Sequence, residues 1–229
     1  MVDVERGLFI VLEGIDNCGK TTQSDLLRQY FENKGLPVIP TREPGGTEVG
    51  EEIRGILLKG RAKMLDPLTQ TLLFFASRTE FIKNVVQPNI QRGVNVISDR
   101  FIASTYVYQG YVQEVDRGFI DSLYNTVVRQ KGTSPDAYII LDIPAEESFR
   151  RDSNADNQDQ ALIYEKQGLD FREKLRQGYL EFATANRVLI VLIDGTQDRD
   201  AIHRQVVKVV EDALERRSQL MQQHTKGES

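Results

Sequence analysis

The segment best suited to chemistry is a glycine-rich stretch near the start of the chain that ends in Lys20 and Thr21. Its residues are Gly14, Ile15, Asp16, Asn17, Cys18, Gly19, Lys20 and Thr21. They fit the Walker A pattern G-x-x-x-x-G-K-[ST] at every defined position. Glycines in such a segment let backbone N–H groups point at phosphate oxygens, while the lysine contacts the β- and γ-phosphates and the hydroxyl suits Mg²⁺. The segment predicts a nucleoside triphosphate site; the alternative is a glycine-rich turn that contains Lys-Thr by chance.

Three later segments pair positively charged side chains with aromatic or acidic ones. Two of them follow apolar runs, and parallel sheets place their ligands beyond the strand ends. The remaining segment, at 73–78, has helical spacing that sets an aromatic ring and an arginine one turn apart. The segments are TREPGGT at 41–47 followed by GEEIR at 50–54, LFFASR at 73–78, and ISDRF at 97–101. Their candidate side chains are Arg42, Glu43, Arg54, Phe74, Arg78, Asp99 and Arg100, with Ser104, Thr105, Tyr108 and Gln109 shortly afterwards.

Several of these side chains also have a purely structural interpretation. Phe74 in an apolar helix could belong to the core, although its position four residues before an arginine favours a place beside a ligand. Arg54 on an acidic helix could form a solvated ion pair worth less than about 1 kcal/mol. Asp99 and Arg100 could pair with each other at a strand end. Cys18 is most simply a small residue tolerated in its loop, rather than a redox group.

Together, these segments closely resemble thymidylate kinases of the bacterial kind. The resemblance rests on the glycine-rich loop followed by Thr-Gln, on the Thr-Arg-Glu-Pro-Gly-Gly-Thr block, on Phe-x-x-x-Arg, and on Asp-Arg-Phe with Ser-Thr-x-x-Tyr-Gln-Gly. Order and spacing agree from residue 8 to about residue 195. The resemblance implies a P-loop NTPase-type fold and direct in-line transfer of the γ-phosphate of ATP to dTMP, which gives dTDP for dTTP synthesis.

The same resemblance implies a role for each candidate residue. ATP would be bound by the loop residues Gly14, Ile15, Asp16, Asn17, Cys18, Gly19, Lys20 and Thr21. The acceptor dTMP would be bound by Asp16, Glu43, Arg54, Phe74, Arg78, Arg100, Ser104, Thr105, Tyr108 and Gln109. Within this set, Phe74 would stack on thymine, while Arg78 and Gln109 would hydrogen-bond to the edge of the base. Tyr108 would crowd the 2′ position and so favour deoxyribose. The cofactor Mg²⁺ would be held by Thr21, by Asp99 through water, and by Glu43.

Catalysis would depend on positioning and charge rather than on covalent protein chemistry. The catalytic groups would be Lys20, Arg42, Asp99, Arg100 and Arg151. Arg151 is included because the bacterial family supplies arginines from a lid after the fourth strand, whereas residues 152–164 contain none. On a helix its neighbour Arg150 would point about 100° away. We expect Arg151 to reach the β,γ-bridge on closure; the alternative is that both are solvated surface arginines.

The elements that must position these residues alternate between short apolar runs and longer segments with helical spacing. The expected strands are 8–13, 38–41, 94–98, 137–142 and 188–194, and the expected helices are 22–33, 66–87, 119–129, 171–185 and 200–217. This alternation predicts an α/β fold, a parallel five-stranded sheet flanked by helices on both faces in a three-layer sandwich. Residues 1–217 would form a single domain with a short lid at about 150–165, and residues 218–229 a disordered tail.

Composition limits the kind of protein and its partners. A chain of 229 residues with 40% hydrophobic residues can bury a core, and its net charge of −5 argues against nucleic-acid binding. The single cysteine fits a reducing compartment, residues 1–7 lack an apolar signal-peptide region, and no run approaches the roughly 20 apolar residues of a membrane span. We expect a cytoplasmic protein that binds ATP and dTMP but neither nucleic acid nor membrane. The resemblance suggests a homodimer.

Two rival functions stay open on the sequence alone. One is another P-loop nucleoside monophosphate or deoxynucleoside kinase, which would differ in its acceptor. The other is a catalytically weak nucleotide-binding protein, suggested by the arginine-poor lid. A GTPase is disfavoured because the only Asn-Lys pair, at 33–34, lacks the aspartate of a guanine-binding box two residues later.

Overall fold

The computed structural model describes residues 6–58, 64–153, 168–186 and 190–227, and these form an α/β fold around one parallel sheet. The strands are β1 Phe9–Glu13, β2 Val38–Arg42, β3 Asn95–Asp99, β4 Ala137–Asp142 and β5 Ile190–Asp194. They lie in the order β2-β3-β1-β4-β5, and every neighbouring pair is parallel. The predicted five-stranded parallel sheet with helices on both faces is confirmed, and each observed strand lies within two residues of its predicted bounds.

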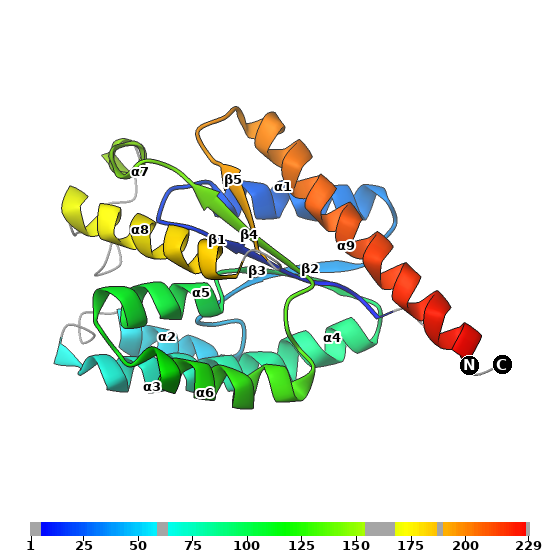
Figure 1. The fold of residues 1–229 in the computed structure, drawn as a ribbon, viewed down its shortest axis with the longest axis horizontal. Helices are drawn as coiled ribbons and strands as arrows, with labels where there is room; N and C mark the ends of the chain where they lie inside the picture. Colours follow the sequence, from blue (N-terminus) through cyan, green and yellow to red (C-terminus); the bar gives the residue numbers. More distant parts are fainter. Residues whose placement is uncertain (1–5, 59–63, 154–167, 187–189, 228–229) are drawn as a thin grey trace.

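Helices cover both faces of the sheet (Figure 1). They are α1 Lys20–Asn33, α2 Glu48–Leu58, α3 Pro67–Phe81, α4 Gln87–Gln91, α5 Ile102–Thr105, α6 Arg117–Val127, α7 Ala145–Ser153, α8 Leu169–Ala185 and α9 Arg199–Gly227. Helices α1 and α9 pack together on one face. Helices α4 and α8 contact the opposite face, and α5 packs against α8. Helices α2, α3 and α6 pack together on the same side, farther from the sheet. None of the helices that the structure describes is both long and apolar enough to cross a membrane.

Two helical segments differ from their expected extent. The segment expected as one helix over 66–87 divides into α3, a π-helical turn at Ile82–Val86, and α4. Pro88 explains the change of geometry, because it has no N–H group to continue the regular hydrogen-bond ladder. Residues 218–227, for which a disordered tail was expected, continue α9, and their glutamine, leucine, methionine and lysine residues favour a helix. Most of the expected lid lies in 154–167, outside the described residues.

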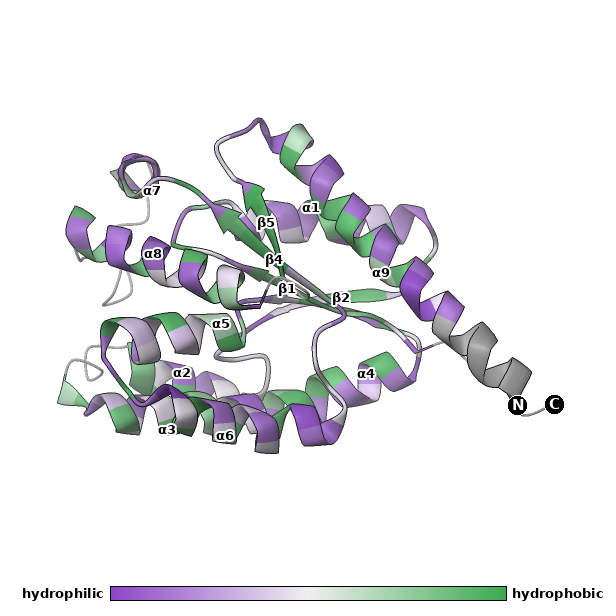
Figure 2. Cartoon of the chain, in the orientation of Figure 1, coloured by the Kyte–Doolittle hydropathy of each residue, from purple (hydrophilic) through white to green (hydrophobic). Residues whose placement is uncertain are grey.

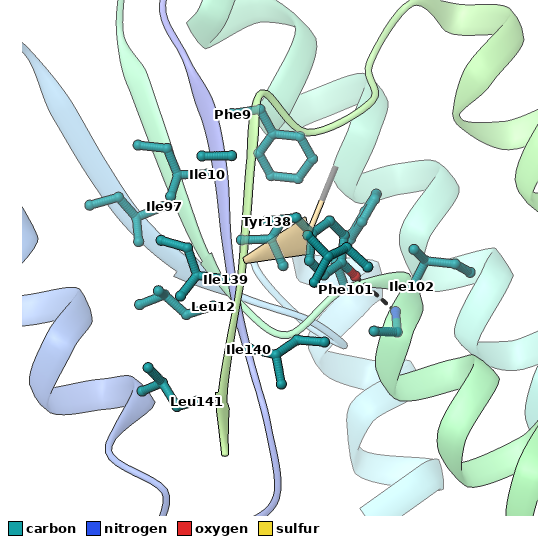
Figure 3. Close-up of a cluster of buried hydrophobic side chains, with 14 of the residues drawn as sticks. Phe9, Ile10, Leu12, Ile97, Phe101, Ile102, Tyr138, Ile139, Ile140 and Leu141 are labelled. Atoms are coloured by element: carbon teal, nitrogen blue, oxygen red, sulfur yellow. Dashed lines mark hydrogen bonds between the residues drawn. The ribbon is translucent and has the colours of Figure 1, made fainter. Parts of the chain in front are cut away.

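The core holds the segment after β3 against β1 and β4. All five residues of β1 are buried, and the Phe9 ring packs edge-on against Phe101, 5.1 Å away between centroids. Beside them, the Tyr138 hydroxyl accepts a 2.8 Å hydrogen bond from the backbone N–H of Ala103 (Figure 3). Figure 2 shows the hydrophobic strands between helices whose faces are mixed. Burial of each large apolar side chain contributes about 1.5–3 kcal/mol, so the turn after β3 is held firmly against the sheet.

Candidate active site

The glycine-rich loop connects β1 to α1. Gly14 has φ +134°, and a Cβ atom there would lie 2.4 Å from the carbonyl oxygen of Leu141, so only glycine fits. Lys20 is 7% exposed, and its ammonium group donates to the carbonyls of Gly14 at 3.2 Å and Ile15 at 3.1 Å. Because α1 begins at the loop, its N-terminal dipole favours an anion there. The loop can therefore bind a phosphate chain.

Thr21 and Asp99 form a site suited to a hard cation at the edge of this loop. The Thr21 hydroxyl lies 3.4 Å from Asp99 Oδ2, and Asp99 Oδ1 is buried without a hydrogen-bond partner among the described residues. Arg42 lines the same open hollow and pairs with Glu51 at 3.0 Å. Within the described part of the chain no three His, Cys, Asp or Glu residues cluster as metal ligands. A Mg²⁺ ion here would keep water and phosphate oxygens as most of its ligands, as this ion commonly does.

A separate cavity lies between α2, α3 and the segment that follows β3. It is lined by all ten residues predicted to bind the acceptor. They are Asp16, Glu43, Arg54, Phe74, Arg78, Arg100, Ser104, Thr105, Tyr108 and Gln109, joined by Pro44, Leu58 and Phe101. Tyr108 and Gln109 reach it from a π-helical turn at Tyr106–Val112, a geometry that is often found at functional sites. Side chains from four distant parts of the sequence thus meet at one hollow.

Two residues that line this cavity carry a buried hydrogen-bond donor and a buried acceptor without partners in the described part of the chain. Arg78 is 1% exposed and donates through Nη2 to the carbonyl of Phe101 at 3.2 Å and the hydroxyl of Thr105 at 3.1 Å. Its Nη1 atom has no hydrogen-bond partner among the described residues, and neither does Oε1 of the buried Gln109. A buried polar group left unpaired costs about 1–3 kcal/mol. The pair is therefore poised to hydrogen-bond to a polar ligand.

Glu43 lies against Arg78 rather than beside the Thr21 and Asp99 pair. Its Oε1 atom is 2.7 Å from Arg78 Nε, an ion pair whose angle is not that of a hydrogen bond. Burial raises the pKa of Glu43 to about 7, because the loss of water outweighs the opposing effect of Arg78 and Glu13 adds a like charge. Of its two expected roles, this geometry favours the acceptor cavity over direct metal ligation.

Arg100 joins the cavity to the glycine-rich loop. Its backbone has φ +72°, in the left-handed region, and its Nη2 atom forms an ion pair with Asp16. Burial alone would raise the pKa of Asp16, but Arg100, Lys20 and Arg172 outweigh burial and hold that pKa below its usual value. The Tyr108 hydroxyl lies 3.5 Å from the same carboxylate. Positive charge from several elements thus converges between the loop and the cavity.

The base of the expected lid touches the loop through one of its two arginines. Arg151 donates from Nη1 to the carbonyl of Asn17 at 3.2 Å and from Nη2 to that of Gly195 at 3.1 Å. Arg150 is 66% exposed and pairs only with Glu147 among the described residues, at 2.7 Å. Arg151 also pairs with Glu147, at 2.7 Å from Nε, so the two guanidinium groups share this carboxylate and differ in that only Arg151 bonds to the loop. Whether Arg151 acts in catalysis stays a prediction.

Sequence reasoning missed buried polar residues that support the site from behind. Arg172 on α8 is 3% exposed and donates to Ser148 at 2.7 Å, and the Ser148 hydroxyl donates to the carbonyl of Asp16 at 2.7 Å. Arg172, Leu175 and Tyr179 share the buried face of α8 at helical spacing. An arginine in an otherwise inward stripe is the signal that could have found this support.

A Walker A loop after the first strand of a parallel sheet, with a separate cavity beside it, is typical of kinases of the P-loop class. A family model described as Thymidylate kinase matches residues 12–206. The chain is 40% identical to a thymidylate kinase of Caldanaerobacter subterraneus subsp. tengcongensis over 209 residues, 91% of this chain and 97% of that one. It is 38% identical to a thymidylate kinase of a Marinomonas species, covering 88% and 92% of the two chains. A crystal structure of thymidylate kinase from Ehrlichia chaffeensis is similar with a TM-score of 0.70 and 34% identity, covering 90% of this chain and 99% of that one. The chain belongs to the thymidylate kinase family.

Proposed function

We propose that the acceptor cavity binds dTMP and the glycine-rich loop binds ATP, so that their phosphates meet at Arg100. The activity that follows from family membership is the ATP-dependent phosphorylation of dTMP to dTDP. The observation that carries the assignment of residues is the unpartnered donor and acceptor in two residues that line the cavity.

The proposal that the base is thymine follows from the positions of the free donor of Arg78 and the free acceptor of Gln109. Thymine presents the O4 acceptor beside the N3–H donor, which complements Arg78 Nη1 and Gln109 Oε1. Cytosine presents the reverse pattern, an amino donor beside an acceptor nitrogen, and would leave buried groups unpaired. The Phe74 ring lines the same cavity, and stacking of a base on an aromatic ring contributes about 1–3 kcal/mol. The cavity therefore favours dTMP over dCMP.

The transfer step is assigned to the charged groups between the two sites. Lys20 leaves its own loop carbonyls to contact the β- and γ-phosphates, while Arg100, Arg42 and Arg54 bind the dTMP phosphate and the transferring group. The acceptor phosphate is anionic at neutral pH, so the reaction requires no strong general base. These residues stabilise charge that spreads over the phosphoryl oxygens during direct in-line transfer.

Mg²⁺ is assigned to the pair of Thr21 and Asp99, with ATP as the phosphate donor. The free oxygen of Asp99 and the nearby hydroxyl fit a hard cation held partly through water. When bound, the ion neutralises phosphate charge. Thr21 and Asp99 would hold the ion through water, and Glu43, which lines the cavity, is assigned to the dTMP sugar.

A second copy of the chain is the partner proposed for α2 and α3. These helices carry four large apolar residues that are 44–47% exposed: Val49, Ile56, Leu68 and Leu72. An apolar face of this kind is typical of a protein interface, and self-association through one face gives a twofold homodimer. The proposed location is the cytoplasm, where the single thiol would stay reduced.

Equilibrium binding of dTMP tests the assignment of the cavity. Phe74→Ala removes the stacking surface and should weaken dTMP binding about 5- to 150-fold, the range that 1–3 kcal/mol of stacking corresponds to. Thr79→Ala is the matched control, because Thr79 is exposed on the same helix and lies outside the cavity. Isothermal titration of both variants decides the matter. Equal dTMP affinity in wild type and Phe74→Ala would place the base elsewhere.

A further inference from the structure

We propose that Glu13 is a positioning residue for phosphoryl transfer, which acts by orienting the hydroxyl groups that hold Arg100. Glu13 is the last residue of β1, is 0% exposed and does not line the acceptor cavity. The inference goes beyond the proposed function and rests on it only in giving Arg100 the dTMP phosphate to bind.

The Glu13 carboxylate collects hydrogen bonds from three separate elements. Its Oε1 atom accepts from the backbone N–H groups of Phe101 at 2.7 Å and Ser104 at 3.1 Å, and from the Tyr138 hydroxyl at 3.3 Å. Its Oε2 atom accepts from the hydroxyls of Ser104 at 2.7 Å and Tyr179 at 3.1 Å. These donors come from the segment formed by the turn after β3 and α5, from β4 and from α8, so one buried charge ties three parts of the fold to the end of β1.

The two hydroxyl groups that donate to Oε2 also accept hydrogen bonds from Arg100, which in addition bonds to the Gly14 carbonyl and pairs with Asp16. Arg100 Nη1 lies 3.1 Å from the Ser104 hydroxyl and 3.0 Å from the Tyr179 hydroxyl. Each hydroxyl has one proton, and a carboxylate can only accept. Because the protons go to Glu13, the hydroxyl oxygens present lone pairs to the guanidinium group. The two hydroxyls are 2.9 Å apart, and whichever donates to the other, the chain of donors still ends on the carboxylate.

Glu13 also stabilises the unusual backbone of Arg100. A φ of +72° is disfavoured for a residue with a side chain and persists only where its surroundings enforce it. Glu13 accepts hydrogen bonds from the backbone N–H groups of Phe101, which directly follows Arg100, and of Ser104, one helical turn later. Glu13 thus fixes both the backbone from which Arg100 projects and the hydroxyls that receive its guanidinium group.

A double-mutant cycle between Glu13→Gln and Arg100→Ala tests the inference. Glutamine has the same size, but its amide NH₂ group cannot accept, so the hydroxyls must reorient. We expect Glu13→Gln to weaken dTMP binding about 30-fold in the wild-type background and less than about 3-fold in the Arg100→Ala background, because residues that act through one another are non-additive. Isothermal titration of dTMP gives the four dissociation constants, and the KM for ATP should change by less than about 3-fold. An equal loss in both backgrounds would overturn the inference.

Two further variants separate positioning from mere stability. Tyr179→Phe keeps the ring and removes one hydroxyl, so it should reproduce a smaller loss, about 5-fold, that disappears in the Arg100→Ala background. This variant decides the matter if Glu13→Gln does not fold, and a loss of equal size in both backgrounds contradicts the proposal. Asn95→Ala is the stability control, because Asn95 is 3% exposed and its side chain bonds only to Leu8 and Pro37 among the described residues. It should lower the Tm and leave dTMP binding by the folded protein within about 2-fold. If Arg100→Ala itself binds dTMP normally, the role given to Arg100 in the proposed function fails instead.

Discussion

The position of the Lys20 side chain leads to a prediction about ATP binding and catalysis. In the described structure its ammonium group bonds to two carbonyls of its own loop, and these bonds must exchange for phosphate oxygens when ATP binds. Lys20→Ala should lower kcat to less than about a tenth of the wild-type value, because it removes the charge aimed at the transferring phosphate. A coupled assay measures the rate, and circular dichroism should show an intact fold. Lys34→Ala is the control, since Lys34 lies beyond the far end of the same helix and pairs with Glu211; a similar loss in both would contradict a specific role.

Glu43 should make the stability of the unliganded protein depend on pH. Burial raises its pKa to about 7 from an ordinary value of 4.5. The folded state therefore holds this proton more tightly than the unfolded state, so the stabilising contribution is present below about pH 4.5 and is lost as pH rises through about 7. The loss is on the order of 3 kcal/mol at most.

Glu43→Gln removes the titrating group and tests this dependence. The fall in the free energy of unfolding between pH 5 and pH 8 should be smaller in the variant than in wild type, as measured by urea titration at each pH. Equal falls in the two proteins would show that Glu43 ionises normally.

The family resemblance of the sequence motifs predicted the residues that line the acceptor cavity, but not the residues that support them. The ten lining residues belong to short local motifs, so the sequence displays them directly. Glu13 and Tyr179 are 166 residues apart, and each resembles an ordinary core residue when it is considered alone. Only the fold shows that Glu13 and Tyr179 belong to one hydrogen-bond network with Arg100.

At the scale of elements, periodicity predicted the strands well and the helical irregularities poorly. Buried apolar runs end at polar residues, which fixed each strand to within two residues of its observed bounds. The π-helical turn at Tyr106–Val112 was not predicted. A π-helix has more residues per turn than an α-helix, and over seven residues this difference hardly changes the spacing of apolar side chains. This π-helical turn nevertheless brings Tyr108 and Gln109 to the cavity.

Helix α7 yields a prediction about its two adjacent arginines. Arg151 already contacts the loop at Asn17, whereas Arg150 points to solvent. With dTMP saturating, Arg151→Ala should lower kcat about 100-fold, below the 10³–10⁵ range of the strongest arginine effects in phosphoryl transfer. Arg150→Ala is the matched control and should change kcat by less than about threefold. If neither change costs more than that, Arg100 and Arg42 stabilise the transition state without help from α7.

At the scale of the whole molecule, the alternation of strands and helices was sufficient to predict a parallel sheet covered on both faces. The order β2-β3-β1-β4-β5 was not predicted from the sequence alone. The strand order depends on which strands pair with each other. The apolar segments that form the strands are similar in length and polarity, so the sequence of each one does not indicate its neighbours in the sheet. This order places β1 and β3 side by side, which brings the glycine-rich loop next to Asp99 and Arg100.

The exposed apolar face of α2 and α3 predicts the oligomeric state. Wild type should have twice the mass of one 26.1 kDa chain in light scattering, and Leu72→Glu should give the mass of one chain because it places charge in the interface. Val191→Glu is the control, as Val191 is 40% exposed on β5, away from these helices. A wild-type protein that is monomeric at micromolar concentration would contradict the proposed dimer.

The choice of acceptor tests the central claim most directly, because it depends on the donor and acceptor order of Arg78 and Gln109. The measurement is kcat/KM for dTMP, dCMP and dGMP with saturating ATP and Mg²⁺ in one coupled assay. Buried groups left unpaired by the wrong base should lower kcat/KM for dCMP and dGMP at least about 100-fold relative to dTMP. Equal values for dTMP and dGMP would contradict the assignment of the cavity to thymine.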